Sequence, residues 1–112
     1  MAWQFTNVST VVNYSDLPTE AKCDWSPCPL SLIAKLAIKT GRHIWVCFPH
    51  QATQACMDSM ASELYSLLAA YPHIKVYTEY SNETWNPSFS QYSYTTNTKS
   101  VGLTVVDNNG AP

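Results

Sequence analysis

Residues 43–80 carry the strongest fold signal of the chain and read HIWVCFPHQATQACMDSMASELYSLLAAYPHIKVYTEY. It opens with the nearly continuous apolar run His43–Phe48, which is typical of a strand buried on both faces. Apolar side chains then recur at helical spacing between about residues 53 and 71, which predicts an amphipathic helix. The β-branched and aromatic residues from Ile74 to Tyr80 predict a second strand. The stretch therefore indicates a strand–helix–strand unit.

Turn-forming residues mark the limits of these elements. Gly41 and Pro49 bound the first strand, Thr53 is a suitable N-cap for the helix, and Pro72 stops it. The apolar stripe of this helix is expected to pack in a core rather than to bind a ligand; its members are Met57, Met60, Ala61, Leu64, Leu67, Leu68 and Tyr71.

The preceding residues extend the same alternation. Residues 3–14 read as the end of a strand that runs into a loop, and residues 15–28 read as loop. A second helix is predicted from Pro29 to Gly41 by the spacing of Leu30, Ile33, Leu36 and Ala37. Strands that alternate with helices predict an α/β fold with right-handed βαβ units and a parallel sheet. Ligands of such sheets bind where the strands end, which here means residues 48–50 and 80–86.

Length and composition restrict the classes of function. The chain has 112 residues, enough for one domain, with 46% apolar and 12% charged residues and a net charge of −2. No basic excess exists to neutralise phosphates, so nucleic acid is not an expected partner. No apolar run approaches the roughly 18 residues of a membrane span, and a membrane is not expected either. The first residues lack the basic and apolar regions of a signal peptide, and the compartment stays open.

Four cysteines allow several arrangements. A local disulfide between Cys23 and Cys28 is one, and a bridge between Cys47 and Cys56 is another. Within an apolar strand and a helix, however, the second pair is typical of small buried free thiols. A zinc site using these cysteines with His43, His50 or His73 is the remaining alternative. The cysteines are not spaced in the close pairs that structural zinc sites usually show, so we expect neither a metal nor another cofactor.

One motif resembles a known family. Residues 76–86, read as Val-Tyr-Thr-Glu-Tyr-Ser-Asn-Glu-Thr-Trp-Asn, resemble the strand-four region of cellulase-like glycoside hydrolases of the retaining (β/α)8-barrel clan, in which an Asn-Glu pair ends a barrel strand. Residues 45–53 resemble the preceding barrel strand and its Pro-His turn, residues 29–41 the helix before it, and residues 1–7 the end of an earlier strand. The resemblance spans residues 1–95, and residues 96–112 form a tail with a possible further strand at 101–106.

The resemblance implies a carbohydrate site. Glu83 matches the general acid/base of the family, and Asn82 matches the residue that holds a sugar hydroxyl. His50 and Trp85 match positions that line the sugar site. These residue types suit the chemistry, because a glycosidic oxygen leaves only when a positioned acid protonates it and a sugar ring stacks well on an aromatic face.

The chain departs from the family in one respect. Retaining hydrolysis needs a nucleophilic carboxylate roughly 5–5.5 Å from the acid/base. Glu79 lies four residues away on the same strand, roughly 13 Å at 3.3 Å per residue, and Asp107 lies in no matching motif. A closed barrel also needs about 200 residues or more. We therefore expect a partial (β/α) barrel of three to four mainly parallel strands and two main helices, weakly active or inactive alone and completed by self-association into a homo-oligomer.

Two other functions remain open. One is a carbohydrate-binding or assembly module without catalysis. The other is a small esterase-like hydrolase that reuses the pocket with Ser81 and His50, although the Gly-x-Ser-x-Gly motif of such enzymes is lacking. For His50 itself, a turn histidine hydrogen-bonded to the backbone is the alternative to a sugar contact.

Overall fold

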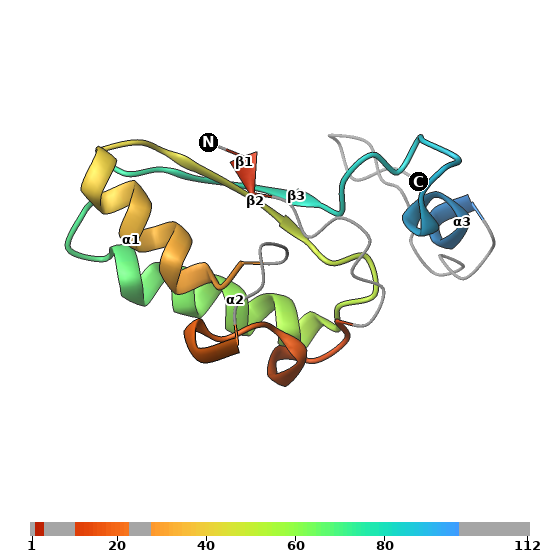
Figure 1. Ribbon diagram of the computed structural model, residues 1–112, viewed down its shortest axis with the longest axis horizontal. Coiled ribbons are helices and arrows are strands. Elements are labelled where there is room, and N and C mark those ends of the chain that lie inside the picture. Colours follow the sequence, from red (N-terminus) through yellow and green to blue (C-terminus); the bar gives the residue numbers. More distant parts are fainter. Residues whose placement is uncertain (1, 4–10, 23–27, 97–112) are drawn as a thin grey trace, which may run out of the picture.

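The computed structural model describes residues 2–3, 11–22 and 28–96, and it confirms the α/β class. Its elements alternate along the chain between strands and helices, with two short 3-10 turns, η1 and η2, in the first crossover (Figure 1). Their bounds are β1 Ala2–Trp3, η1 Tyr14–Asp16, η2 Glu20–Lys22, α1 Leu30–Thr40, β2 Ile44–Phe48, α2 Gln54–Leu68, β3 Val76–Tyr80 and α3 Ser90–Thr96. None of these helices is long and apolar enough to cross a membrane.

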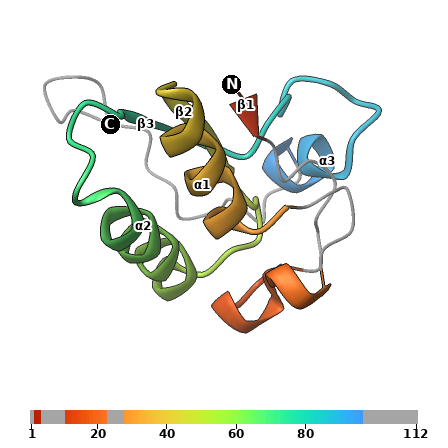
Figure 2. The same cartoon turned by 60° about the vertical axis from the view of Figure 1, so that its left-hand side comes forward.

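The predicted parallel sheet is confirmed. Its strand order is β1-β2-β3, and both neighbouring pairs are parallel, with Ile44 opposite Val76 and Phe48 opposite Tyr80. Each crossover thus moves one strand along the sheet in the same direction. Helices α1 and α2 lie side by side on one face of the sheet (Figures 1 and 2).

Local signals set the helix ends. Gly41 follows α1 with φ 63°, a left-handed conformation that glycine adopts without a side-chain clash. The Thr53 side chain accepts a hydrogen bond from the Cys56 N–H at 3.2 Å and caps α2 as predicted. Helix α2 ends at Leu68, a few residues before the predicted end near Tyr71, because Pro72 has no N–H to bond the Leu68 carbonyl and its ring would clash with that carbonyl.

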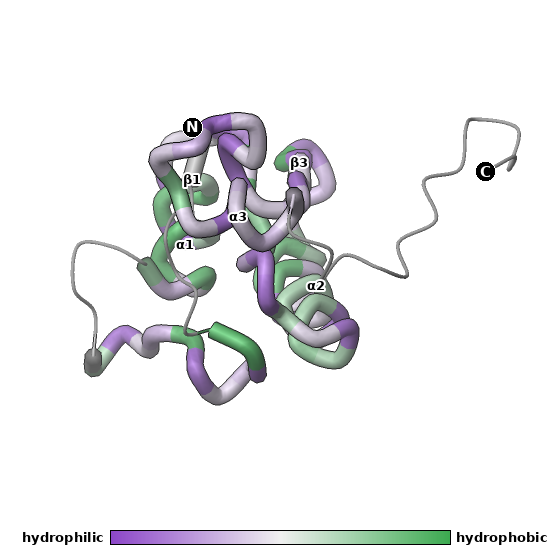
Figure 3. The backbone as a smooth tube through the Cα atoms, turned by 90° about the vertical axis from the view of Figure 1, so that its right-hand side faces the viewer, coloured by the Kyte–Doolittle hydropathy of each residue, from purple (hydrophilic) through white to green (hydrophobic). Residues whose placement is uncertain are grey.

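The core lies between the two helices and the sheet. Apolar colouring is concentrated on α1 and α2, whereas α3 is mostly polar (Figure 3). The side chains of this core all come from the helix-covered face or from the segments next to it; they are Val11, Leu30, Ile33, Ala34, Ala37, Ile44, Val46, Cys56, Met60, Leu64, Leu68 and Ile74. Most of the apolar stripe predicted for α2 is therefore core, as expected, but Ala61 is exposed and Met57 is half-buried outside the core.

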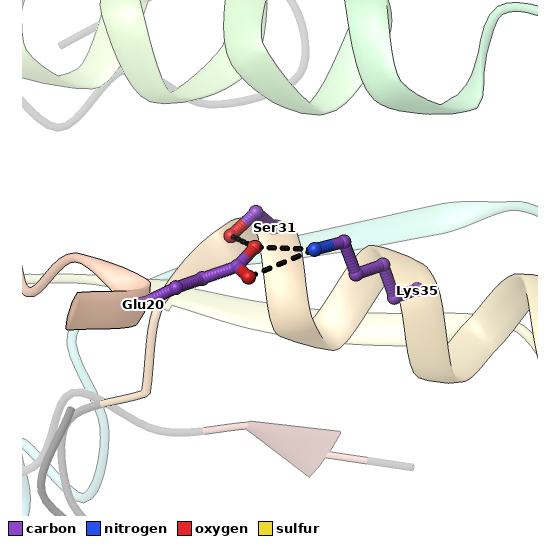
Figure 4. Close-up of polar contacts among 3 residues, drawn as sticks. All are labelled: Glu20, Ser31 and Lys35. Atoms are coloured by element: carbon purple, nitrogen blue, oxygen red, sulfur yellow. Dashed lines mark hydrogen bonds and ion pairs between the residues drawn. The ribbon is translucent and has the colours of Figure 1, made fainter.

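A small polar cluster holds η2 against α1. The Glu20 carboxylate accepts hydrogen bonds from Lys35 Nζ at 2.7 and 2.8 Å and from Ser31 Oγ at 2.6 Å (Figure 4). These bonds, first that of the ammonium and then that of the hydroxyl, lower the pKa of Glu20. The described turn η2 is thereby attached to helix α1.

Two sequence expectations were wrong. The sequence predicts that Trp45 is buried on a strand covered on both faces, but Trp45 is 46% exposed on the face away from the helices. Cys47, on the same face, is buried. Helix α3 was not predicted, because its Ser, Tyr and Thr residues have low helix propensity and form no apolar stripe.

Candidate functional site

The carboxyl ends of β2 and β3 are held together beyond the last paired residues. The Ser81 N–H donates to the Phe48 carbonyl at 2.8 Å, so the segments that follow the two strands leave the sheet side by side. His50 follows β2, and the Asn82-Glu83 pair follows β3. The sequence prediction that these residues share one edge of the sheet agrees with this arrangement.

The turn after β3 is strained. Ser81 has φ 59° and Glu83 has φ 49°, a left-handed conformation that is uncommon for residues other than glycine. Asn82 lies between them, and both Ser81 and Asn82 are buried. Strain of this kind costs on the order of 1–3 kcal/mol per residue and gathers at functional sites. The tight turn makes Asn82 and Glu83 end the strand rather than continue it.

Glu83 is half-buried and held by a neighbour in its own turn. Its carboxylate Oε2 accepts a hydrogen bond from Asn86 Nδ2 at 3.0 Å, and its carbonyl accepts from the Asn86 N–H at 3.0 Å. The Asn86 side chain also accepts a bond from the Ser88 N–H at 3.0 Å, which fixes the amide orientation. These bonds hold the Glu83 carboxylate within its own turn. Trp85, between the two partners, presents its ring to solvent.

His50 is buried with unused hydrogen-bonding capacity. It is 2% exposed, and neither ring nitrogen has a hydrogen-bond partner among the described residues. Its carbonyl accepts from Tyr80 Oη at 2.7 Å, and the Tyr94 ring meets the imidazole edge to face at 5.3 Å. Burial lowers the pKa of His50, so the ring is neutral at pH 7. Within the described residues the His50 ring therefore does not bond the backbone, in contrast to the alternative of a turn histidine.

Gln91 is a site residue that sequence reasoning missed. It is fully buried, and its Nε2 donates to the Asn82 carbonyl at 2.8 Å, which docks α3 onto the strained turn. Its Oε1 has no partner among the described residues. A single glutamine in a run of Ser, Tyr and Thr carries no signal of burial, so no sequence pattern would have found it.

Other acidic and nucleophilic side chains near this edge are Glu79, Cys47 and Ser81. Glu79 Oε2 accepts from Cys47 Sγ at 3.8 Å on the open face of the sheet. Burial, and secondly the Glu79 charge, raise the pKa of the Cys47 thiol to about 11, so this thiol is unreactive at neutral pH. Because the His50 ring nitrogens make no bond within the described residues, Ser81 and His50 do not form the hydrogen-bonded pair that an esterase needs.

Cysteine and metal chemistry is limited in the described part of the chain. Cys47 and Cys56 are buried free thiols, so the alternative of a bridge between them is wrong. Cys23 lies outside the described residues, and its pairing with Cys28 stays a prediction. Within residues 11–22 and 28–96, no three His, Cys, Asp or Glu side chains lie close enough together to hold a metal ion.

No protein family, no curated protein and no solved structure matches this chain.

Proposed function

We propose that this chain is a partial (β/α) barrel that binds carbohydrate and carries, in Glu83, the acid/base carboxylate of a retaining glycoside hydrolase. The observation that carries the proposal is that His50 follows β2, and Asn82 and Glu83 follow β3, at the same carboxyl edge of a parallel sheet. That edge is where (β/α) barrels place their active sites.

The winding of the sheet favours a barrel over an open doubly wound sheet. In a doubly wound fold the strand order reverses and helices cover both faces. Here the order β1-β2-β3 follows the chain, and α1 and α2 cover one face only. The uncovered face carries Trp45 and Tyr77 side by side, in positions that would point into the interior of a barrel.

The side chains at the edge suit a sugar. Trp85 offers an exposed aromatic face on which a pyranose ring stacks, and Glu83 lies two residues away. The unpartnered His50 nitrogens would bond ligand hydroxyls, which requires the covering Tyr94 ring to turn aside. Burying such nitrogens without partners costs about 1–3 kcal/mol, a cost that a bound hydroxyl would remove.

Catalysis in this proposal needs one more group. A retaining mechanism uses a nucleophilic carboxylate roughly 5–5.5 Å from the acid/base. Glu79 is the nearest acidic residue in sequence, and its carboxylate lies against Cys47 on the open face. Binding is therefore the activity proposed for the chain itself, and turnover is proposed to be weak or absent until a second carboxylate is brought to Glu83.

The test combines ligand binding with turnover. Tryptophan fluorescence is titrated with β-linked gluco-, xylo- and manno-oligosaccharides, and aryl β-glycosides report hydrolysis. Trp85→Ala is expected to weaken binding about tenfold or more, because a stacked aromatic ring contributes on the order of 1 kcal/mol or more. Glu83→Gln is expected to keep binding and to remove any residual turnover, whereas the matched control Glu63→Gln changes neither. Absence of binding to every oligosaccharide, or turnover that survives Glu83→Gln, would overturn the proposal.

A carbohydrate-binding module without catalysis is the second candidate. The exposure of Trp85, together with the contact of the Glu79 side chain with Cys47, favours it. Both candidates predict that binding survives in Glu83→Gln. Glycoside turnover that Glu83→Gln removes would select the first candidate, whereas binding with no glycoside turnover in the unmodified chain would select the second. Hydrolysis of an aryl ester that survives Glu83→Gln would instead point to the esterase-like alternative.

A further inference from the structure

The outer edge of β3 is the least covered part of the sheet. Strands β2 and β3 have equal length and pair in register, yet β2 is mostly buried, whereas four of the five residues of β3 are exposed. Within the described residues β3 pairs only with β2. The edge carries no proline, and its residues Val76–Tyr80 are β-branched or aromatic apart from Glu79. Such an edge is a template for another strand.

Two hydrogen bonds show which backbone groups point outward. The Ile44 N–H donates to the Lys75 carbonyl at 3.0 Å, and the Ser81 N–H donates to the Phe48 carbonyl, so odd-numbered residues direct their backbone toward β2. Because the direction alternates along a strand, Val76, Thr78 and Tyr80 direct their N–H and C=O groups toward the open edge.

We propose that this edge binds β3 of a second copy of the chain, antiparallel, about a twofold axis at Tyr77. In this register Val76 and the partner's Thr78 form a hydrogen-bonded pair, and Tyr77 faces the partner's Tyr77 as a non-hydrogen-bonded pair. Lys75 then stands opposite the partner's Glu79, and Glu79 opposite the partner's Lys75. The inference does not rest on the proposed carbohydrate function.

Charge complementarity selects this register. Lys75, Tyr77 and Glu79 alternate onto the open face, and both charged residues are exposed. The pattern of a cation, an aromatic ring and an anion is self-complementary about its centre, so the twofold gives two opposite-charge pairs beside an aromatic pair. A shift by two residues would keep the backbone bonds but would place Lys75 opposite the partner's Ser81. That register lacks both ion pairs.

An apolar groove on the other face of β3 adds contact area. It has a volume of about 420 Å³ and lies between α2 and β3, lined among others by Leu68, Ile74, Val76 and Thr78. Strand pairing at the edge would bring the partner's Tyr80 opposite Ile74 and join the grooves of the two copies across the twofold. The second copy would thus cover apolar surface that is exposed in the single chain.

The first test is charge exchange in the full chain, read by sedimentation equilibrium over a range of protein concentrations. Lys75→Glu and Glu79→Lys each place like charges opposite one another twice per dimer, and each is expected to weaken association about tenfold or more. The double variant restores opposite charges and is expected to associate within about threefold of the unmodified chain. A chain that stays monomeric, or a double variant as weak as the single variants, would overturn the proposal.

The second test traps the twofold contact. In a non-hydrogen-bonded antiparallel pair the Cα atoms lie about 4.5 Å apart, within the range of a disulfide. Tyr77→Cys is expected to form a covalent dimer under mild oxidation, several-fold faster than Leu36→Cys, which places an exposed thiol on α1. Equal rates for the two variants would show that another surface, or another segment pairing with β3, occupies the edge, and would overturn the proposal. Circular dichroism confirms that each variant remains folded.

Discussion

The buried side chains on the helix-covered face of the sheet differ in kind from those at its carboxyl edge. Under the helices, buried side chains such as Ile33, Val46 and Met60 are apolar and need no partners. At the edge, the buried side chains are His50, Asn82 and Gln91, with two residues of the same turn in a left-handed conformation.

The difference separates stability from function in this protein. Apolar burial supplies most of the folding free energy, whereas strain and unpartnered polar atoms cost free energy. Because natural structures keep such costs where they serve binding or catalysis, the edge is the better candidate for a functional site. The comparison predicts large losses in the free energy of unfolding for substitutions under the helices. It predicts smaller losses, or changes in the pH dependence of stability, for substitutions at the edge.

The largest effect is expected for Met60→Ala. Met60 is fully buried between the helices and the sheet, so the change should lower the free energy of unfolding by about 2–5 kcal/mol in urea titrations followed by circular dichroism. Leu36→Ala, at a position 43% exposed on α1, is the control and should cost about 1 kcal/mol or less. Equal losses would contradict the placement of the core.

Gln91→Ala should have an intermediate effect. The change leaves the buried Asn82 carbonyl without the donor that holds α3, and the expected loss in free energy of unfolding is about 1–3 kcal/mol in the same titrations. Ser93→Ala changes an exposed residue of the same helix and should stay within about 0.5 kcal/mol. A loss no larger than that control would mean that α3 is not docked through Gln91.

His50→Phe should change the pH dependence of stability more than it changes the stability at pH 7. Because the folded-state pKa of His50 lies below its unfolded value of about 6.5, the unfolded chain binds more protons and stability falls as the pH drops below that value. In the variant, the fall in stability at acidic pH that is due to His50 should be absent. The variant should lose little or no stability at pH 7, since it removes two unpartnered nitrogens. Denaturant titrations between pH 5 and pH 8 measure the stability at pH 7 and its slope with pH. The variant Leu36→Ala, which changes no titrating group, should keep the slope of the unmodified chain, and identical slopes in all three proteins would refute the interpretation.

The smallest effect is expected for Tyr14→Phe, away from both regions. Tyr14 Oη donates to Glu63 Oε2 at 2.6 Å, and this bond raises the pKa of Tyr14 to about 12. The contribution to stability is complete below the unfolded pKa of about 10 and is lost as the pH rises toward 12. Because Tyr14 is 42% exposed, solvent screening should keep the loss below about 1 kcal/mol. Burial also raises the pKa of Tyr80. Ultraviolet titration of Tyr14→Phe should therefore show one late-titrating tyrosine fewer than the unmodified chain, whereas Tyr65→Phe should keep the late titration of Tyr14.

Much of the fold was predictable because its signals are local. Helical spacing identified α1 and α2, Thr53 and Gly41 marked their ends, and alternation with apolar runs indicated β2 and β3. The candidate edge was also predictable, since parallel strands collect their carboxyl ends together. Helix α3 was not, because its residues have neither the propensity nor the apolar spacing of a helix.

Local residue patterns suffice for the order of elements, the helix caps and the positions that end each strand, because these features depend on residues within a few positions of one another. The folded chain was needed to learn that Trp45 is exposed, that the His50 ring has no hydrogen-bond partner among the described residues, and that Gln91 bonds the strained turn. Burial and hydrogen bonding of these residues depend on elements far away in the chain. A pattern of neighbouring residues in the sequence does not show which distant elements pack against one another.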